Sequence, residues 1–258
     1  MRIISLCADG IHQAAERSLF AWLASQDADI ICLQNLKAQE HELEWQPQFE
    51  LEGYFAYFFG DAEPNSNGVA IYTREMPKAL MYGFGFASGE DMKGRYLQAD
   101  FAHTSVGSLL APVGITGTPS QDVKRQFFND LQAHLEKISH KRRSYIICGN
   151  WNIAHNDNDL ENPDDYREES GFLTSERSWL NALFGDLGYC DAFRRGNSDT
   201  DEFSWWPSGK IGQGDGRRVD YQVVSNELAP LVEYAIMYKA KEFSAHTPVI
   251  VDYDIEEL

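Results

Sequence analysis

Polar side chains follow a short apolar run near the middle of the chain. Residues 145–148 read Tyr-Ile-Ile-Cys, and Gly149, Asn150 and Asn152 come directly after them. A run of this length is typical of a buried strand and too short for a helix. An amide can orient a phosphate or a water, but it has no charge to hold a divalent cation and cannot act as a base near neutral pH. We interpret Gly149 as the residue that lets the backbone turn and approach a ligand.

Other predicted strands also end in residue types that could do chemistry. Because α/β proteins place ligand sites at the carboxyl ends of core strands, we expect these residues to meet in one cleft. The expected site consists of Asp9, Asn35, Asn150, Asn152, Asp220 and His246.

Plainer roles stay open for some of these residues. His246, before a Thr-Pro turn, could be a structural hydrogen-bonding residue, and Asp220 could be an ion-paired strand residue beside Arg217 and Arg218. Trp205 and Trp206 could stack on bases, although core and rim packing is the commoner use of such a pair.

An acidic segment from 157 to 170 partly matches a calcium-binding loop. Asp157, Asp159, Glu161 and Glu168 occupy loop positions 1, 3, 5 and 12, but position 6 is Asn162 rather than glycine. Flanking helices are not evident either. We therefore expect a solvated acidic loop, with calcium as the alternative.

Composition bounds the function. A chain of 258 residues with 43% hydrophobic content can bury a large core, and we expect one domain over residues 1–258. The formal charge of -18 argues against a protein that binds nucleic acid unaided, since nonspecific affinity comes mainly from cations that neutralise phosphates. Binding would need a local basic patch or a basic partner.

The spacing of the cysteines and the lengths of the apolar runs indicate the cellular compartment. The four cysteines are far apart and show no metal-ligand spacing, which predicts reduced, buried thiols; they are Cys7, Cys32, Cys148 and Cys190. The first residues are already strand-like, and no apolar run approaches the length of a membrane span. We expect a cytoplasmic protein without membrane contact.

The order of elements predicts the fold. Helices are expected over residues 11–26, 120–139 and 175–184, and a hairpin over 54–59 and 69–73. Further strands are expected at 2–7, 28–34, 94–101, 108–113, 145–148, 203–207, 218–224, 232–238 and 249–253. Many strands with only three strong helices favour two packed sheets with helices outside. The expected class is α/β (α+β), a four-layer αββα sandwich of two mixed sheets.

Together the strand-end motifs resemble the endonuclease/exonuclease/phosphatase superfamily, nearest to exonuclease III. Leu33-Gln34-Asn35 is similar to that family's Leu-Gln-Glu, whose Glu holds the metal, and Gly149-Asn150-Trp151-Asn152 is similar to its Gly-Asp-x-Asn. Arg218-Val219-Asp220 matches its Arg-Ile-Asp, whereas Ala245 stands where its Ser-Asp-His has a carboxylate before His246.

This resemblance implies a site that has lost charge at three positions. Asn35, Asn150 and Ala245 replace carboxylates, Cys7 and Asp9 replace the first-strand Asn pair, and the Tyr expected after the middle strand is absent. Magnesium with few protein ligands depends on carboxylate charge, and a missing general base costs about two to four orders of magnitude. We therefore expect a vestigial pocket with no active catalytic residue and no metal.

Several blocks resemble a regulatory branch of this superfamily, the catabolite repression control (Crc) proteins. They include the opening Met-Arg-Ile-Ile-Ser, residues 203–207 (Phe-Ser-Trp-Trp-Pro) and residues 219–223 (Val-Asp-Tyr-Gln-Val). The resemblance implies a catalytically inactive, exonuclease III-like protein that assists Hfq in the translational repression of A-rich mRNAs. Its implied partners are Hfq and an A-rich mRNA in a ternary complex, with a homodimer left open.

An enzyme is the alternative prediction. It is a magnesium-dependent phosphodiesterase of the exodeoxyribonuclease III or AP endonuclease type, with Asp9 and Asp220 as metal ligands. Magnesium is expected only if the protein is this enzyme. No cofactor is expected if it is the regulatory protein.

A basic run is the expected contact for RNA or a protein partner in so acidic a chain. It comprises Lys137, His140, Lys141, Arg142 and Arg143, to which Lys124 and Arg125 could add. The plainer interpretation is a helix C-terminus at which cations are favoured by the helix dipole.

Overall fold

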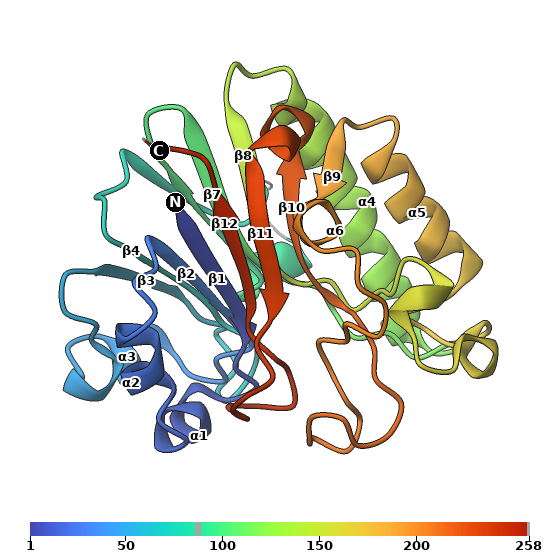
Figure 1. Ribbon diagram of the computed structural model, residues 1–258, viewed down its shortest axis with the longest axis horizontal. Helices are drawn as coiled ribbons and strands as arrows, with labels where there is room; N and C mark the ends of the chain where they lie inside the picture. The colour runs from blue at the N-terminus through green and yellow to red at the C-terminus, as the bar shows by residue number, and fades with distance from the viewer. Residues whose placement is uncertain (86–88, 257–258) are drawn as a thin grey trace.

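Two six-stranded mixed sheets pack face to face, with helices on their outer faces (Figure 1). The computed structural model describes residues 1–85 and 89–256. The first sheet has the order β11-β12-β1-β2-β4-β3 and the second the order β5-β6-β7-β8-β10-β9. The predicted αββα class is confirmed.

The first sheet consists of β1 (Arg2–Cys7), β2 (Ile30–Gln34), β3 (Phe55–Phe59), β4 (Val69–Thr73), β11 (Val232–Met237) and β12 (Val249–Tyr253). The second consists of β5 (Ala79–Tyr82), β6 (Tyr96–Asp100), β7 (Thr104–Leu110), β8 (Ser144–Asn150), β9 (Tyr189–Asp191) and β10 (Asp220–Ser225). The helices are α1 (Ile11–Glu16), α2 (Leu19–Ala24), α3 (Glu40–Leu43), α4 (Pro119–Ser139), α5 (Thr174–Phe184) and α6 (Ala192–Gly196). Short 3-10 turns include Asp157–Asp159 and Pro163–Tyr166.

Three apolar clusters hold these layers together. One lies between the sheets and includes Cys32, Val106 and Cys148. A second packs α1 and α2 on the first sheet, and a third packs α4 and α5 on the second. The outer face of each sheet is apolar and must be covered, so helices with an apolar stripe pack there.

Some predicted elements differ from the observed ones. The helix expected over 11–26 is divided into α1 and α2, because Ser18 has a left-handed backbone conformation (φ 66°). The strand expected over 203–207 is reduced to isolated bridges from Trp205 to Arg217 and His246. The short strands β5 and β9 were not predicted. The β3–β4 hairpin is confirmed.

The four cysteines are buried and free, as predicted. Among the described residues, no helix is long and apolar enough to cross a membrane.

Strand direction brings the polar strand ends to one edge of the sandwich. β1 and β2 are parallel, with Cys7 opposite Gln34, and both end at the lower edge in Figure 1. β8 ends at the same edge, where Asn150 pairs with Asp220 at the start of antiparallel β10. The connections that follow these strands therefore surround a single site.

Gly149 has a packing role instead of the expected turning role. It lies within β8 opposite Leu109 of β7, and its φ is not positive. A Cβ atom at this position would lie 2.0 Å from the carbonyl oxygen of Leu109. The glycine is therefore needed for close approach of two strands, and the prediction that it turns the chain toward a ligand is wrong.

We expect Gly149→Ala to lower the free energy of unfolding by about 3 kcal/mol or more, because a strand backbone must shift. Gly53→Ala is the comparison: Gly53 has φ +82° but open space around it, so only the left-handed conformation is penalised, by about 1–2 kcal/mol. Urea denaturation of both variants measures the difference. Equal losses would contradict the packing explanation.

Candidate active site

A cavity of about 460 Å³ opens at the edge where β1, β2 and β8 end. Five of the six residues predicted for the site line it, namely Asp9, Asn35, Asn150, Asn152 and His246. The sixth, Asp220, is buried and hydrogen-bonded to two of them. Residues from both sheets and from the C-terminal segment are thus brought together in one place.

Three of these residues have left-handed backbone conformations. Their φ angles are 49° for Asp9, 53° for Asn35 and 53° for Asn152. Asn and Asp tolerate this conformation better than other residues with a side chain. They therefore turn the chain at the strand ends, in addition to any chemical role.

Asp220 is the centre of the polar network beneath the cavity. Its Oδ1 accepts a hydrogen bond from Asn150 Nδ2 (3.0 Å). Its Oδ2 accepts from Ser204 Oγ (2.6 Å) and lies 2.8 Å from His246 Nδ1. Neither neighbouring arginine pairs with it among the described residues. Asp220 therefore orients His246, and the interpretation as an arginine-paired strand residue is wrong.

The charge of His246 follows from this contact. Burial alone would lower the pKa of the imidazole, but the negative charge of Asp220, with smaller contributions from Cys7, holds the pKa well above its ordinary value. Burial also raises the pKa of the Cys7 thiol, against the influence of His246. The site therefore combines an imidazolium with a neutral thiol, since burial disfavours the thiolate.

Asn150 has a buried oxygen without a partner. Its Nδ2 donates to Asp220, which fixes the amide so that Oδ1 is on the other side. Oδ1 has no hydrogen-bond partner among the described residues, although Asn150 is only 2% exposed. A buried acceptor left unpaired costs about 1–3 kcal/mol, so it is a place where a water or a ligand donor would be stabilised.

Asp9 is already paired on the opposite side of the cavity. Its Oδ1 lies 2.7 Å from Lys37 Nζ and accepts a hydrogen bond from Asn35 Nδ2 (3.0 Å). This carboxylate therefore has a cation partner from the protein itself.

The residues present do not fit a magnesium site. Magnesium in such enzymes is held by one or two carboxylates together with substrate phosphates. Across residues 1–85 and 89–256, no group of three or more His, Cys, Asp or Glu side chains could hold a metal ion. Asp9 is occupied by Lys37, and Asp220 by three protein donors. The two carboxylates predicted as alternative ligands are therefore each satisfied separately.

Several residues around the cavity were missed by sequence reasoning. Arg217 lines it, with the guanidinium carbon 3.9 Å from the ring centre of Tyr166 and 5.1 Å from that of Trp205. Arg95 lines it as well, and Ser204 supports Asp220 from below. Trp206 is buried, so of the tryptophan pair only Trp205 reaches the cavity. The aromatic residues on both sides of Arg217 were visible in the sequence, but their spatial contact was not.

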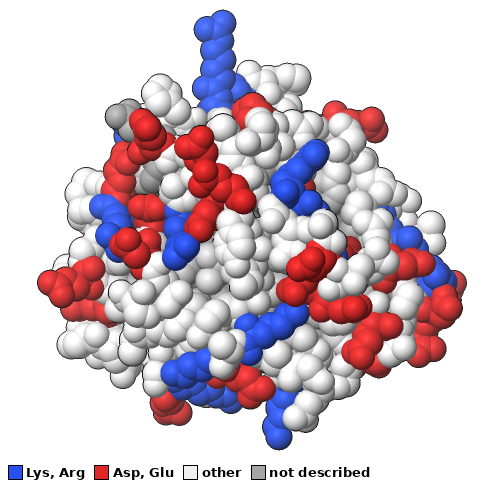
Figure 2. All heavy atoms as spheres, viewed as in Figure 1, with Lys and Arg blue, Asp and Glu red and all other residues white. Residues whose placement is uncertain are grey.

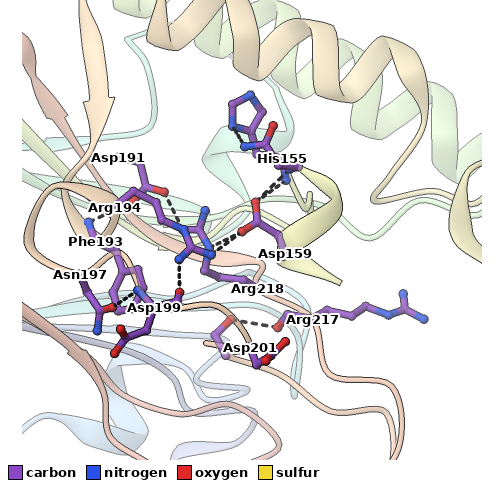
Figure 3. A network of polar contacts seen from close by, with 12 residues as sticks. His155, Asp159, Asp191, Phe193, Arg194, Asn197, Asp199, Asp201, Arg217 and Arg218 are labelled. Carbon is purple, nitrogen blue, oxygen red and sulfur yellow. Dashed lines mark hydrogen bonds and ion pairs between the residues drawn. The ribbon is translucent and has the colours of Figure 1, made fainter. Parts of the chain in front are cut away.

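Unlike Arg217, the neighbouring Arg218 is paired with carboxylates. Figure 3 shows it between Asp159 and Asp191, while Arg217 points away from this network. The Nε–Oδ1 distance to Asp159 is 2.8 Å, and the Nη1–Oδ2 distance to Asp191 is 2.6 Å. Arg194 also reaches Asp159, at 3.0 Å. These ion pairs hold Arg218 in place, and they therefore fix the start of β10, where Asp220 lies.

This network also excludes the predicted calcium alternative. Asp159 is 1% exposed, and arginines neutralise it. Asp157 pairs with Arg167 and Arg177. The acidic segment is thus partly an internal ion-pair network, and the expectation of a merely solvated loop is wrong for Asp159.

The basic run lies far from the cavity. It precedes Ser144 at the start of β8, whereas Asn150 ends that strand, a distance of about 20 Å for seven residues. Lys124 is not part of a surface patch, because it is buried and paired with Glu176 (2.7 Å). Arg143 donates to the carbonyl of Phe101. In Figure 2 acidic and basic side chains are interspersed over the face shown.

Comparisons with known proteins agree with this geometry. Residues 12–238 match the Endonuclease/Exonuclease/phosphatase family. An exodeoxyribonuclease of Bacillus subtilis is 30% identical over 253 residues, which cover 96% of this chain and 98% of that protein. Exodeoxyribonuclease III of Haemophilus influenzae is also 30% identical, over 98% of this chain and 100% of that protein. An AP endonuclease from Archaeoglobus fulgidus has the same fold (TM-score 0.89, 23% identity, 99% and 100% of the two chains).

These relatives correct the predicted function. They match over nearly the whole chain and are named as DNA nucleases. A catalytically inactive regulator that assists Hfq in repressing A-rich mRNAs is therefore the wrong prediction. The lost carboxylates were taken as the loss of function, whereas full-length similarity supports the enzyme that was the alternative.

We expect Asp159→Asn to lower the free energy of unfolding by about 3–5 kcal/mol at neutral pH, because it leaves buried arginine charge without its partner. Although burial alone would raise the pKa of Asp159, Arg218 and other donors lower it to about 2. The carboxylate thus stabilises the fold above its unfolded pKa, and this contribution is lost as the pH falls toward 2.

The measurement is urea denaturation of the wild type and of Asp159→Asn from pH 7 to pH 3. The difference between their free energies of unfolding should be constant above about pH 4 and should narrow below it. Asp157→Asn, at an exposed ion pair, is the control and should cost less than about 1 kcal/mol. A difference for Asp159→Asn that is as small as the control would contradict the network.

Proposed function

This chain belongs to the Endonuclease/Exonuclease/phosphatase family, and from that membership we propose that it is a DNA phosphoesterase of the exonuclease III or AP endonuclease type. The observation that carries the proposal is the buried pair of His246 and Asp220 at the cavity, with a 2.8 Å contact. A histidine oriented by a carboxylate is the arrangement that phosphoryl chemistry needs for a fixed proton donor or a fixed positive charge.

The side chains at the cavity have separable tasks in this proposal. His246 donates a hydrogen bond to a phosphate oxygen, where negative charge increases during the reaction. Asn150 Oδ1, which is without a protein partner, accepts a hydrogen bond from the attacking water and orients it. Ser204 and Asp220 keep the imidazole in place.

The same site lacks a strong base. Asn150 can orient a water but cannot take its proton near neutral pH. A missing general base costs about 10²–10⁴ in rate. We therefore propose slow turnover, with positioning and charge as the main sources of acceleration.

The cavity size favours a nucleotide end or a base-free sugar as the reacting group. A volume of about 460 Å³ is within the range of small-molecule sites. Trp205 and Tyr166 at its border offer flat aromatic surfaces on which a neighbouring base could stack. Proteins similar to this chain are named for action at 3′ phosphates and at apurinic or apyrimidinic sites.

The test uses three duplex substrates: one with a 3′ phosphate, one with a recessed 3′ hydroxyl end and one with an abasic-site analogue. Each is incubated with the purified protein in magnesium, in manganese and in EDTA. We expect slow cleavage of at least one substrate. His246→Gln should reduce the rate by at least about 100-fold.

His140→Gln is the matched control, because His140 is exposed at the far end of the molecule. It is purified in the same way and should keep the wild-type rate, so that loss of activity in His246→Gln alone excludes a contaminating nuclease. No cleavage of any substrate by concentrated wild-type protein would overturn the proposed function. So would a rate that is the same in His246→Gln.

A further inference from the structure

The cavity reverses the charge of the chain around it. The whole protein has a formal charge of -18, yet among the described residues that line the cavity Asp9 is the only carboxylate. Arg95, Lys124, Arg217 and His246 line the same cavity. A concave surface lined mainly by one sign of charge attracts ligands of the opposite sign. The excess of cations in the lining therefore favours an anionic ligand.

Two of these cations are free to bind it. Lys124 is neutralised by Glu176 at 2.7 Å, and Asp9 is neutralised by Lys37. Arg217 stacks on Tyr166 and Trp205 and forms no ion pair with a carboxylate among the described residues, and its buried Nε has no hydrogen-bond partner there.

Arg95 is similar. Its Nε lies 3.6 Å from Glu90, which has a closer partner in Lys93 at 2.5 Å. This Nε also has no hydrogen-bond partner in the described part of the chain. Both arginines line the cavity, and guanidinium is the side chain best suited to phosphate.

Asn150 adds an unused acceptor to these unused donors. Its Oδ1 is unpaired, and the residue is 2% exposed at the cavity. A group that offers several acceptor oxygens and also one donor satisfies the whole set. Hydrogen phosphate and a phosphate monoester with one protonated oxygen have this composition, whereas sulfate lacks the donor.

The neutral amides remove the need for a bridging cation. A site rich in carboxylates repels phosphate unless a divalent metal lies between them. At Asn35 and Asn150 the side chains are uncharged, and Ala245 has no polar group. Repulsion of this kind is therefore reduced, and a cation would have few ligands, because Asp9 and Asp220 are already paired with protein groups.

We propose that the cavity binds a terminal phosphate group directly, through Arg95, Arg217 and His246, without a divalent metal. The inference rests on the proposed function and specifies its ligand. It differs from metal-mediated binding in one measurable respect: affinity for phosphate should not change when metal is removed.

The test is isothermal titration calorimetry of the full chain with inorganic phosphate. We expect the affinity in EDTA and in magnesium to agree within about twofold, and sulfate to bind at least about tenfold more weakly because it cannot satisfy Asn150. Arg217→Gln should weaken phosphate binding by about 10-fold or more, since hydrogen bonds to charged groups contribute about 1.5–3 kcal/mol. Arg125→Gln, at an exposed ion pair with Asp122, is the matched control and should leave the affinity unchanged.

A second pair of variants tests the role of the amides. Asn35→Glu with Asn150→Asp should weaken phosphate binding in EDTA by at least about tenfold, because two negative charges return to the cavity. Magnesium should then improve binding in this variant and not in the wild type. Asn226→Asp, at an exposed position after β10, adds one negative charge outside the cavity and should have no effect.

The outcomes separate this inference from the proposed function. Phosphate binding only in magnesium, or no phosphate binding in either buffer, overturns the inference even if DNA is cleaved. Sulfate binding as tight as phosphate overturns the role of Asn150. Metal-independent phosphate binding without cleavage of any DNA substrate supports the inference and overturns the proposed function.

Discussion

The carboxylate of Asp220 is the constraint on which the rest of the site depends. A buried negative charge must be compensated by hydrogen bonds or by positive charge. Here the donors come from three separate parts of the chain: Asn150 at the end of β8, Ser204 in the long connection before β10, and His246 before β12. Satisfying one charge therefore joins the second sheet to the C-terminal segment of the first. Arg218 strengthens this arrangement, because its own compensation by Asp159 and Asp191 fixes the backbone two residues away.

The fold could be predicted where apolar periodicity was strong. Long amphipathic helix α4 and the β3–β4 hairpin follow directly from their patterns. The division between α1 and α2 could not be predicted, since Ser18 is an ordinary helix residue and its left-handed conformation (φ 66°) reflects packing. Gly149 shows the same limit, because its neighbour Leu109 is forty residues away in the sequence.

The site was predictable in its membership and less so in its interactions. Strand ends converge by topology, so the residues of the cavity could be chosen without coordinates. Partners could not. Asp159 was assigned to a loop with a calcium-like spacing, but its partner Arg218 is 59 residues away. Arg217 and Arg218 are adjacent in the sequence and point in opposite directions (Figure 3), so one is neutralised and the other reaches the cavity.

Because amides replace carboxylates at the cavity, the site residues alone suggest an inactive protein, whereas the overall similarity to nucleases suggests an enzyme. Asn and Asp have nearly the same shape, but Asn150 donates a hydrogen bond to Asp220 that an ionised Asp at the same position could not donate. Whole-chain identity and backbone similarity are set by the chain as a whole and hardly change when a few side chains at one site differ. The charge at the cavity depends on a few atoms and can change while nearly every packing contact is preserved. In the proposed phosphate site, guanidinium and imidazole groups supply the positive charge that a divalent metal would supply in a site rich in carboxylates.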